Sequence, residues 1–60
     1  MELIMNFIDK LRYAEIYQRE EQPPYILVKY DDQHNKVSET FYTDLDQAAA
    51  EGDAWRLSND

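Results

Sequence analysis

A chain of 60 residues without a single cysteine has to fold around a hydrophobic core alone, because neither a disulfide nor a thiolate-bound zinc can staple it. A domain of this size buries about 60% of the surface that its unfolded chain exposes, so we expect one small domain over residues 1–60. The hydrophobic fraction of 43%, with eight aromatic residues, indicates a folded domain rather than a disordered one. The lack of cysteine also makes a reducing cytoplasm the expected compartment.

The N-terminal third carries apolar residues at spacings of three and four, the pattern of an amphipathic helix, with neither glycine nor proline among them. These residues are Leu3, Ile4, Phe7, Ile8, Leu11 and Ala14. Pro23-Pro24 follows, and the residue before a proline is driven toward an extended conformation. The pattern predicts a helix over about 2–21.

The middle of the chain is typical of a β-hairpin. Residues 25–30 and 36–42 are rich in β-branched and aromatic side chains, and the second stretch alternates between apolar and polar residues. The polar residues 31–35 between them have the composition of a loop. We therefore predict a hairpin over about 25–42.

A second helix is predicted over about 44–52, with Asp44 as its N-cap and Gly52 as the residue that closes it. Leu45, Ala48 and Ala49 would face the sheet. Beyond Gly52, residues 54–57 are predicted to form a third short strand, and residues 58–60 a frayed tail. The resulting order is α-β-β-α-β, an α+β domain with its helices on one face of a small antiparallel sheet.

The sequence offers no constellation of residues typical of catalysis or of metal binding. The single histidine, His34, falls in the predicted loop without an orienting partner, which is typical of a solvated residue. A calcium loop counted from Asp31 would need glycine and glutamate where Lys36 and Tyr42 stand. One glycine cannot build a phosphate-binding loop, and the longest aliphatic run has three residues, so it cannot span a membrane. We expect no enzyme activity, no cofactor, no metal and no membrane contact.

The C-terminal residues 44–60 hold five acidic residues against one basic residue, a net charge of −4 out of −7 for the chain. On the predicted helix these acids would point outward and could steer a basic protein partner. A solvated helix face is the alternative interpretation. The partner-binding acids predicted here are Asp44, Asp46, Glu51 and Asp53.

A second surface is predicted on the helix over 2–21. Tyr13 and Tyr17 lie outside its main apolar stripe, with Ile16 beside them, and tyrosine is enriched at binding hot spots. The alternative is that these side chains are exposed to solvent without any binding role. Under the first interpretation, Tyr13, Ile16 and Tyr17 anchor a partner.

These features predict a non-enzymatic interaction protein that binds and modulates or inhibits a larger, basic protein, such as one that handles nucleic acid. Antitoxins, phage inhibitors and DNA mimics are analogous in size and charge alone. The alternative is a self-assembling subunit that dimerises through the predicted helix 2–21. A third interpretation, a nucleic-acid-binding regulator, needs Lys10, Arg12 and Arg19 to overcome the charge of −7, so direct nucleic-acid contact is not expected.

Overall fold

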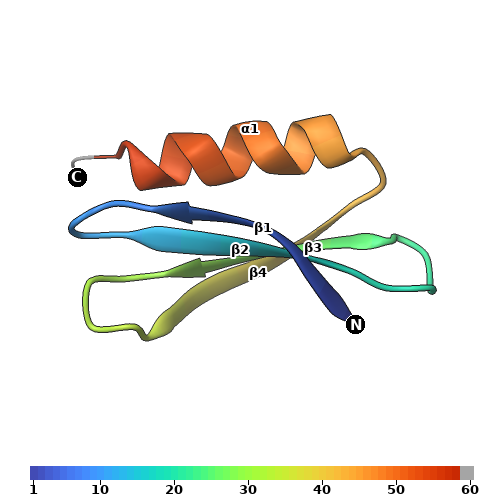
Figure 1. Ribbon diagram of the computed structural model, residues 1–60, viewed down its shortest axis with the longest axis horizontal. Coiled ribbons are helices and arrows are strands. Elements are labelled where there is room, and N and C mark those ends of the chain that lie inside the picture. Colours follow the sequence, from blue (N-terminus) through green and yellow to red (C-terminus); the bar gives the residue numbers. More distant parts are fainter. Residues whose placement is uncertain (59–60) are drawn as a thin grey trace.

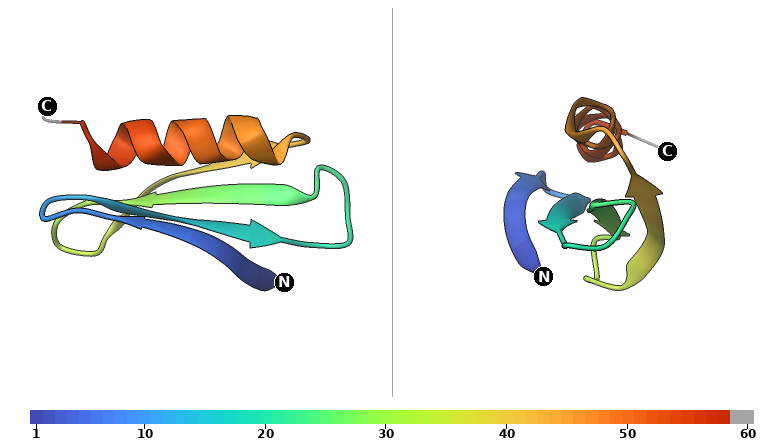
Figure 2. Two further views of the ribbon diagram at one scale, coloured as in Figure 1. Left: turned by 45° about the horizontal axis from the view of Figure 1, so that its top comes forward. Right: turned by 90° about the vertical axis from the view of Figure 1, so that its right-hand side faces the viewer.

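The fold is a four-stranded antiparallel meander with one helix packed across it (Figure 1). The computed structural model describes residues 1–58. The strands follow one another in the sheet in the order β1-β2-β3-β4, and the helix covers one face (Figure 2). The elements are β1 (Glu2–Ile8), β2 (Tyr13–Gln18), β3 (Tyr25–Tyr30), β4 (Lys36–Tyr42) and α1 (Leu45–Arg56).

The predicted helix over 2–21 is wrong, because this segment forms the hairpin of β1 and β2. A bulge between Leu3 and Met5 shifts the alternation of β1 by one residue. Ile4 and Phe7, three residues apart, therefore both pack against the core, and this spacing imitates that of a helix. The order α-β-β-α-β is thereby corrected to β-β-β-β-α, which still has its helix on one face of an antiparallel sheet.

The turn between β1 and β2 carries no glycine or proline that would mark it in the sequence. The backbone N–H of Asp9 donates to the carbonyl of Arg12 at 2.9 Å, and that of Lys10 donates to Asp9 Oδ1 at 2.7 Å. The Asp9 carboxylate thus supplies a local acceptor that stabilises the turn without a positive backbone φ.

The predicted hairpin over 25–42 is confirmed, with both strands at the predicted residues. In its loop, Asp31 Oδ1 accepts from the backbone N–H groups of Gln33 and Asn35, both at 2.9 Å. These bonds, the one from Asn35 foremost, lower the pKa of the Asp31 carboxyl. His34 adopts a φ of 66°, the left-handed conformation that turns the chain back toward β4.

The C-terminal segment is one helix, and its predicted start is confirmed. Asp44 is the N-cap and its Oδ1 accepts from the backbone N–H of Asp46 at 3.0 Å. The predicted end at Gly52 and the predicted strand over 54–57 are wrong, because α1 continues to Arg56 and ends at Leu57. Of the predicted tail over 58–60, only Ser58 lies within the described residues.

Gly52 is needed for close packing rather than for a turn. A Cβ atom at this position would lie 2.7 Å from Phe7 Cδ2 and Cε2, inside the distance that two carbon atoms tolerate. Ala48 is fully buried one turn earlier, so the helix presents a small-residue stripe to the sheet. The core of fully buried side chains lies between these two layers and consists of Ala14, Ile16, Leu27 and Ala48.

We expect Gly52→Ala to lower the free energy of unfolding by about 1 kcal/mol. The overlap with the Phe7 ring costs about 1–3 kcal/mol, and the higher helix propensity of alanine offsets about 1 kcal/mol of it. In a Phe7→Leu background the overlap is relieved, so the same substitution should become neutral or stabilising. Urea unfolding followed by Trp55 fluorescence measures both values, and equal effects in the two backgrounds would contradict the packing argument.

Candidate functional site

The candidate site is the face of the sheet that α1 does not cover, here called the open face. Alternation along each strand assigns its residues, since side chains at every second position point to the same side. Direct cross-strand partners give three rows across the sheet. From β1 to β4 the rows are Leu3, Tyr17, Ile26 and Phe41; Asn6, Glu15, Val28 and Glu39; and Ile8, Tyr13, Tyr30 and Lys36.

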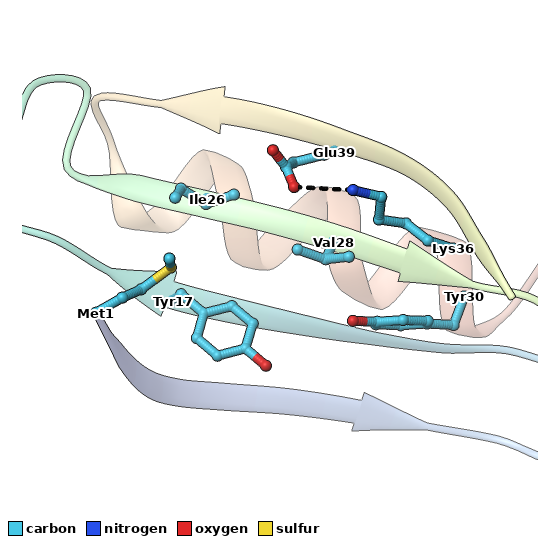
Figure 3. A pocket seen from close by; sticks show the side chains of 7 residues that line it. All are labelled: Met1, Tyr17, Ile26, Val28, Tyr30, Lys36 and Glu39. Atoms are coloured by element: carbon cyan, nitrogen blue, oxygen red, sulfur yellow. Dashed lines mark hydrogen bonds and ion pairs between the residues drawn. The ribbon is translucent and has the colours of Figure 1, made fainter. Parts of the chain in front are cut away.

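The open face is hollowed around its centre (Figure 3). The hollow has a volume of about 480 Å³ and is lined by Met1, Tyr17, Ile26, Val28, Tyr30, Lys36 and Glu39. Ile26 and Val28 form its apolar floor. They are only 5% and 6% exposed, although no helix lies over them. Side chains of the neighbouring strands bury them instead, and the polar groups stand around this floor.

Glu15 and Tyr17 form a polar pair at the border of the hollow. The Tyr17 hydroxyl donates to Glu15 Oε1 at 2.8 Å, between two residues that share one face of β2. This hydrogen bond, with burial second, raises the pKa of Tyr17 from 10.0 to about 12. Burial and the Glu15 carboxylate also raise the pKa of Tyr30. Both tyrosines therefore stay neutral while Glu15 gives this part of the face its negative charge.

Further side chains of the open face contact one another. Lys36 Nζ lies 3.3 Å from Glu39 Oε1 (Figure 3), an exposed pair within β4. The rings of Tyr13 and Tyr30 stack with centroids 4.6 Å apart and an angle of 11° between their planes. The His34 ring lies 5.2 Å from that of Tyr13. This stack fills one end of the face with aromatic side chains.

Most of the chain's basic side chains are engaged within the molecule. The guanidinium of Arg12 lies 4.7 Å from the centroid of Trp55, and Lys29 Nζ lies 5.6 Å from it. Arg19 lies 4.9 Å from the Phe41 ring and donates to the carbonyl of Pro23. Arg56 pairs with Asp53 as Lys36 does with Glu39. A smaller share of the carboxylates is engaged in this way, so carboxylates give the surface its negative charge.

The four predicted acids lie on the helix side, away from the open face. Asp44 serves as the N-cap, and Asp53 Oδ1 pairs with Arg56 Nη2 at 2.6 Å. Asp46 and Glu51 are exposed. Two of the four acids therefore already have a structural role, and none lies beside the predicted tyrosines.

The three predicted anchors are divided between the two faces of β2. Tyr13 and Tyr17 lie together on the open face, four residues apart on a strand rather than on a helix. Ile16 is fully buried beneath α1, so the predicted role of Ile16 as a partner anchor does not fit the structure. The prediction lacked Glu15, Tyr30, Lys36 and Glu39. The signal that could have found this face is the run of apolar residues in 25–30, because alternation along a strand places them on both sides of the sheet.

The arrangement suits binding through stacking, apolar contact and carboxylate hydrogen bonds. Among residues 1–58, no group of three or more histidine, cysteine, aspartate or glutamate side chains could hold a metal ion. At 12 residues, α1 falls short of the length and apolarity that crossing a membrane requires, and the described part of the chain has no other helix. Comparisons with known protein families, with curated proteins and with solved structures found no match.

Glu15→Gln should lower the pKa of Tyr17 from about 12 toward 10.0, because it replaces the charged acceptor of the Tyr17 hydrogen bond with a neutral one and removes the charge that disfavours tyrosinate. NMR titration of the Tyr17 ring carbons measures this value, and an unchanged pKa would refute the role of Glu15. Because the folded state keeps Tyr17 protonated to higher pH than the unfolded chain does, its contribution to stability is complete below pH 10 and declines as the pH rises to about 12. The decline should be smaller in Glu15→Gln.

Proposed function

We propose that this protein is a non-enzymatic binding domain that docks a larger protein on its open face. One observation carries the proposal: the single helix covers one side of the sheet and leaves an aromatic and aliphatic surface on the other. Ile8 is 66% exposed, and Leu3 and Phe41 are each 45% exposed. An exposed apolar surface that also carries polar groups is typical of a protein-binding site.

The composition of the open face supports the same proposal. Tyr13, Tyr17 and Tyr30 lie close together there, and tyrosine combines a large apolar area with few rotatable bonds and a hydroxyl that can bind water or a partner. The small core adds a reason for association, because a partner that binds only the folded state stabilises it. Occupation of the partner's surface would modulate or block its other interactions, as expected for an inhibitor.

The electrostatics argue against acid–base catalysis at this face. A general acid or base works best when its pKa lies near the working pH, whereas the pKa of Tyr17 is moved further from neutrality, to about 12. The tyrosines are therefore assigned to binding. The lack of cysteine fits a reducing compartment, so the cytoplasm is the proposed location.

Two earlier alternatives lose their structural basis. Dimerisation through a helix over 2–21 does not apply, because those residues form β1 and β2. For nucleic-acid binding, Arg12 and Arg19 lie at opposite ends of β2, about 23 Å apart at the rise of an extended strand. Their guanidinium groups contact Trp55 and Phe41 and do not form one basic surface.

A matched pair of double variants tests the proposal. Leu3→Ser with Phe41→Ser removes exposed apolar side chains from the open face, and Leu11→Ser with Leu57→Ser removes two that lie elsewhere. Immobilised proteins would capture partners from a lysate of cells that make the protein, and calorimetry would then measure affinity for the purified partner. We expect the open-face variant to bind at least about tenfold more weakly than the wild type and the other variant to bind normally.

A third variant, Asp46→Asn with Glu51→Gln, separates the open face from the acidic helix. Loss of the partner in this variant, with full binding by the open-face variant, would overturn the proposal and assign binding to α1. Circular dichroism of each variant confirms that the fold is retained. Capture of further copies of this chain alone, with an oligomer seen by light scattering, would also overturn docking of a larger protein.

A further inference from the structure

We infer that the hollow of the open face receives an arginine side chain of a basic protein partner. The inference rests on the proposed function and specifies the chemistry that the open face recognises. Three observations carry it: the carboxylate of Glu39 lines the hollow with that of Glu15 beside it, two tyrosine rings line the same hollow, and the whole chain is negatively charged.

The middle row of the open face places carboxylates on both sides of a buried valine. Glu15 on β2 and Glu39 on β4 are the direct cross-strand partners of Val28, so their backbones lie about 10 Å apart. Val28 is 6% exposed and forms an apolar floor between them. A guanidinium group suits this combination, since it is planar and weakly hydrated and accepts apolar contact on its faces while donating from its edges.

Glu15 is the carboxylate with more capacity for a ligand. It accepts a hydrogen bond from Tyr17 at 2.8 Å and also interacts with the Tyr30 hydroxyl, whereas an ionised carboxylate has about four acceptor positions. The Tyr17 bond also restrains the Glu15 side chain, which reduces the entropy that binding would cost. Glu39 is partly neutralised by Lys36 at 3.3 Å, so it contributes less attraction. A guanidinium can bind Glu15 with two parallel hydrogen bonds.

The Tyr17 ring, and the face of the Tyr30 ring that Tyr13 does not cover, supply surfaces on which a guanidinium stacks. Arg12 lies over Trp55 at 4.7 Å, and Arg19 lies over Phe41 of the open face at 4.9 Å, so this chain uses that contact twice. Within residues 1–58, no basic side chain lies over Tyr17 or Tyr30. These two rings line the hollow (Figure 3) beside the negative charge of Glu15, which strengthens attraction for a cation.

The charge of the chain selects a foreign basic partner over a second copy. Two copies would each carry a net charge of −7, and their close approach is opposed by that repulsion. The arginines of a second copy are also engaged already, because Arg12 and Arg19 lie over aromatic rings and Arg56 is paired with Asp53. A basic partner meets no such obstacle and is steered toward this protein at low ionic strength.

An NMR titration with N-acetyl-arginine amide tests the inference, with N-acetyl-citrulline amide as the uncharged control of nearly the same shape. Saturable shifts at Tyr17, Val28 and Tyr30, with a dissociation constant on the order of 1 mM, are expected for the arginine probe. The citrulline probe should give no saturable shift there. Equal binding of both probes, or shifts confined to α1, would overturn the inference.

Three single variants sharpen the result, because each removes one charge. Glu15→Gln keeps an acceptor for the Tyr17 hydroxyl and should weaken binding of the arginine probe about fivefold. Lys36→Gln removes the competing cation and should strengthen binding about twofold, a gain that damage to the fold would not produce. Glu51→Gln, on the exposed side of α1, makes the same charge change as Glu15→Gln and should leave binding unchanged. Equal weakening in both glutamate variants would reduce the effect to net charge and overturn the inference.

The inference and the proposed function fail in distinguishable ways. A captured partner that needs Leu3 and Phe41 but binds Glu15→Gln at full strength would overturn the arginine inference and leave docking on the open face supported. A partner that is insensitive to the Leu3 and Phe41 substitutions would instead overturn the proposed function itself.

Discussion

The approach of α1 to the sheet at Gly52 is the constraint on which the rest of the structure depends. The Phe7 ring lies where a side chain at position 52 would stand, and Ala48 continues the same small surface one turn earlier. Without these small residues the helix would be held away from Ile16 and Leu27, and residues 1–58 contain no second helix to cover them. Close packing recovers dispersion contacts that a gap would forfeit.

Because α1 packs on one side of the sheet, the opposite side stays open. A single helix covers one face, so the side chains that alternate with the core must be tolerated by water or covered by another molecule. Here they are tyrosines and aliphatic residues around two carboxylates, rather than the fully polar set that an isolated domain would favour. The engagement of most cations with aromatic rings or carboxylates leaves the surface negative. The apolar character of the open face thus follows from the position of α1 on the other side of the sheet. Its negative charge follows from the engagement of the cations.

The sequence was informative where local chemistry and tertiary structure agree. Residues 25–30 and 36–42 were correctly predicted as strands because their β-branched and aromatic content has no competing interpretation. Asp44 was correctly predicted as an N-cap because its role depends on its own side chain and the next backbone N–H groups. The prediction of a helix end at Gly52 was wrong, because the sequence does not distinguish a glycine required by a neighbouring ring from one required by a turn.

The N-terminal third shows what only the tertiary structure decides. A β-bulge brings Ile4 and Phe7 to the same side of β1. The Asp9 carboxylate stabilises the turn between β1 and β2, which therefore lacks the glycine that would have indicated a hairpin. Apolar spacing alone therefore fits a helix as well as two strands. The sequence by itself determined the size, the negative charge, the central hairpin and the helix start, all of which are local or additive properties. Pairing with β3 decided that residues 13–18 are a strand, and this placed Tyr13 and Tyr17 on the open face and Ile16 in the core, since backbone hydrogen bonds to a distant strand outweigh local periodicity.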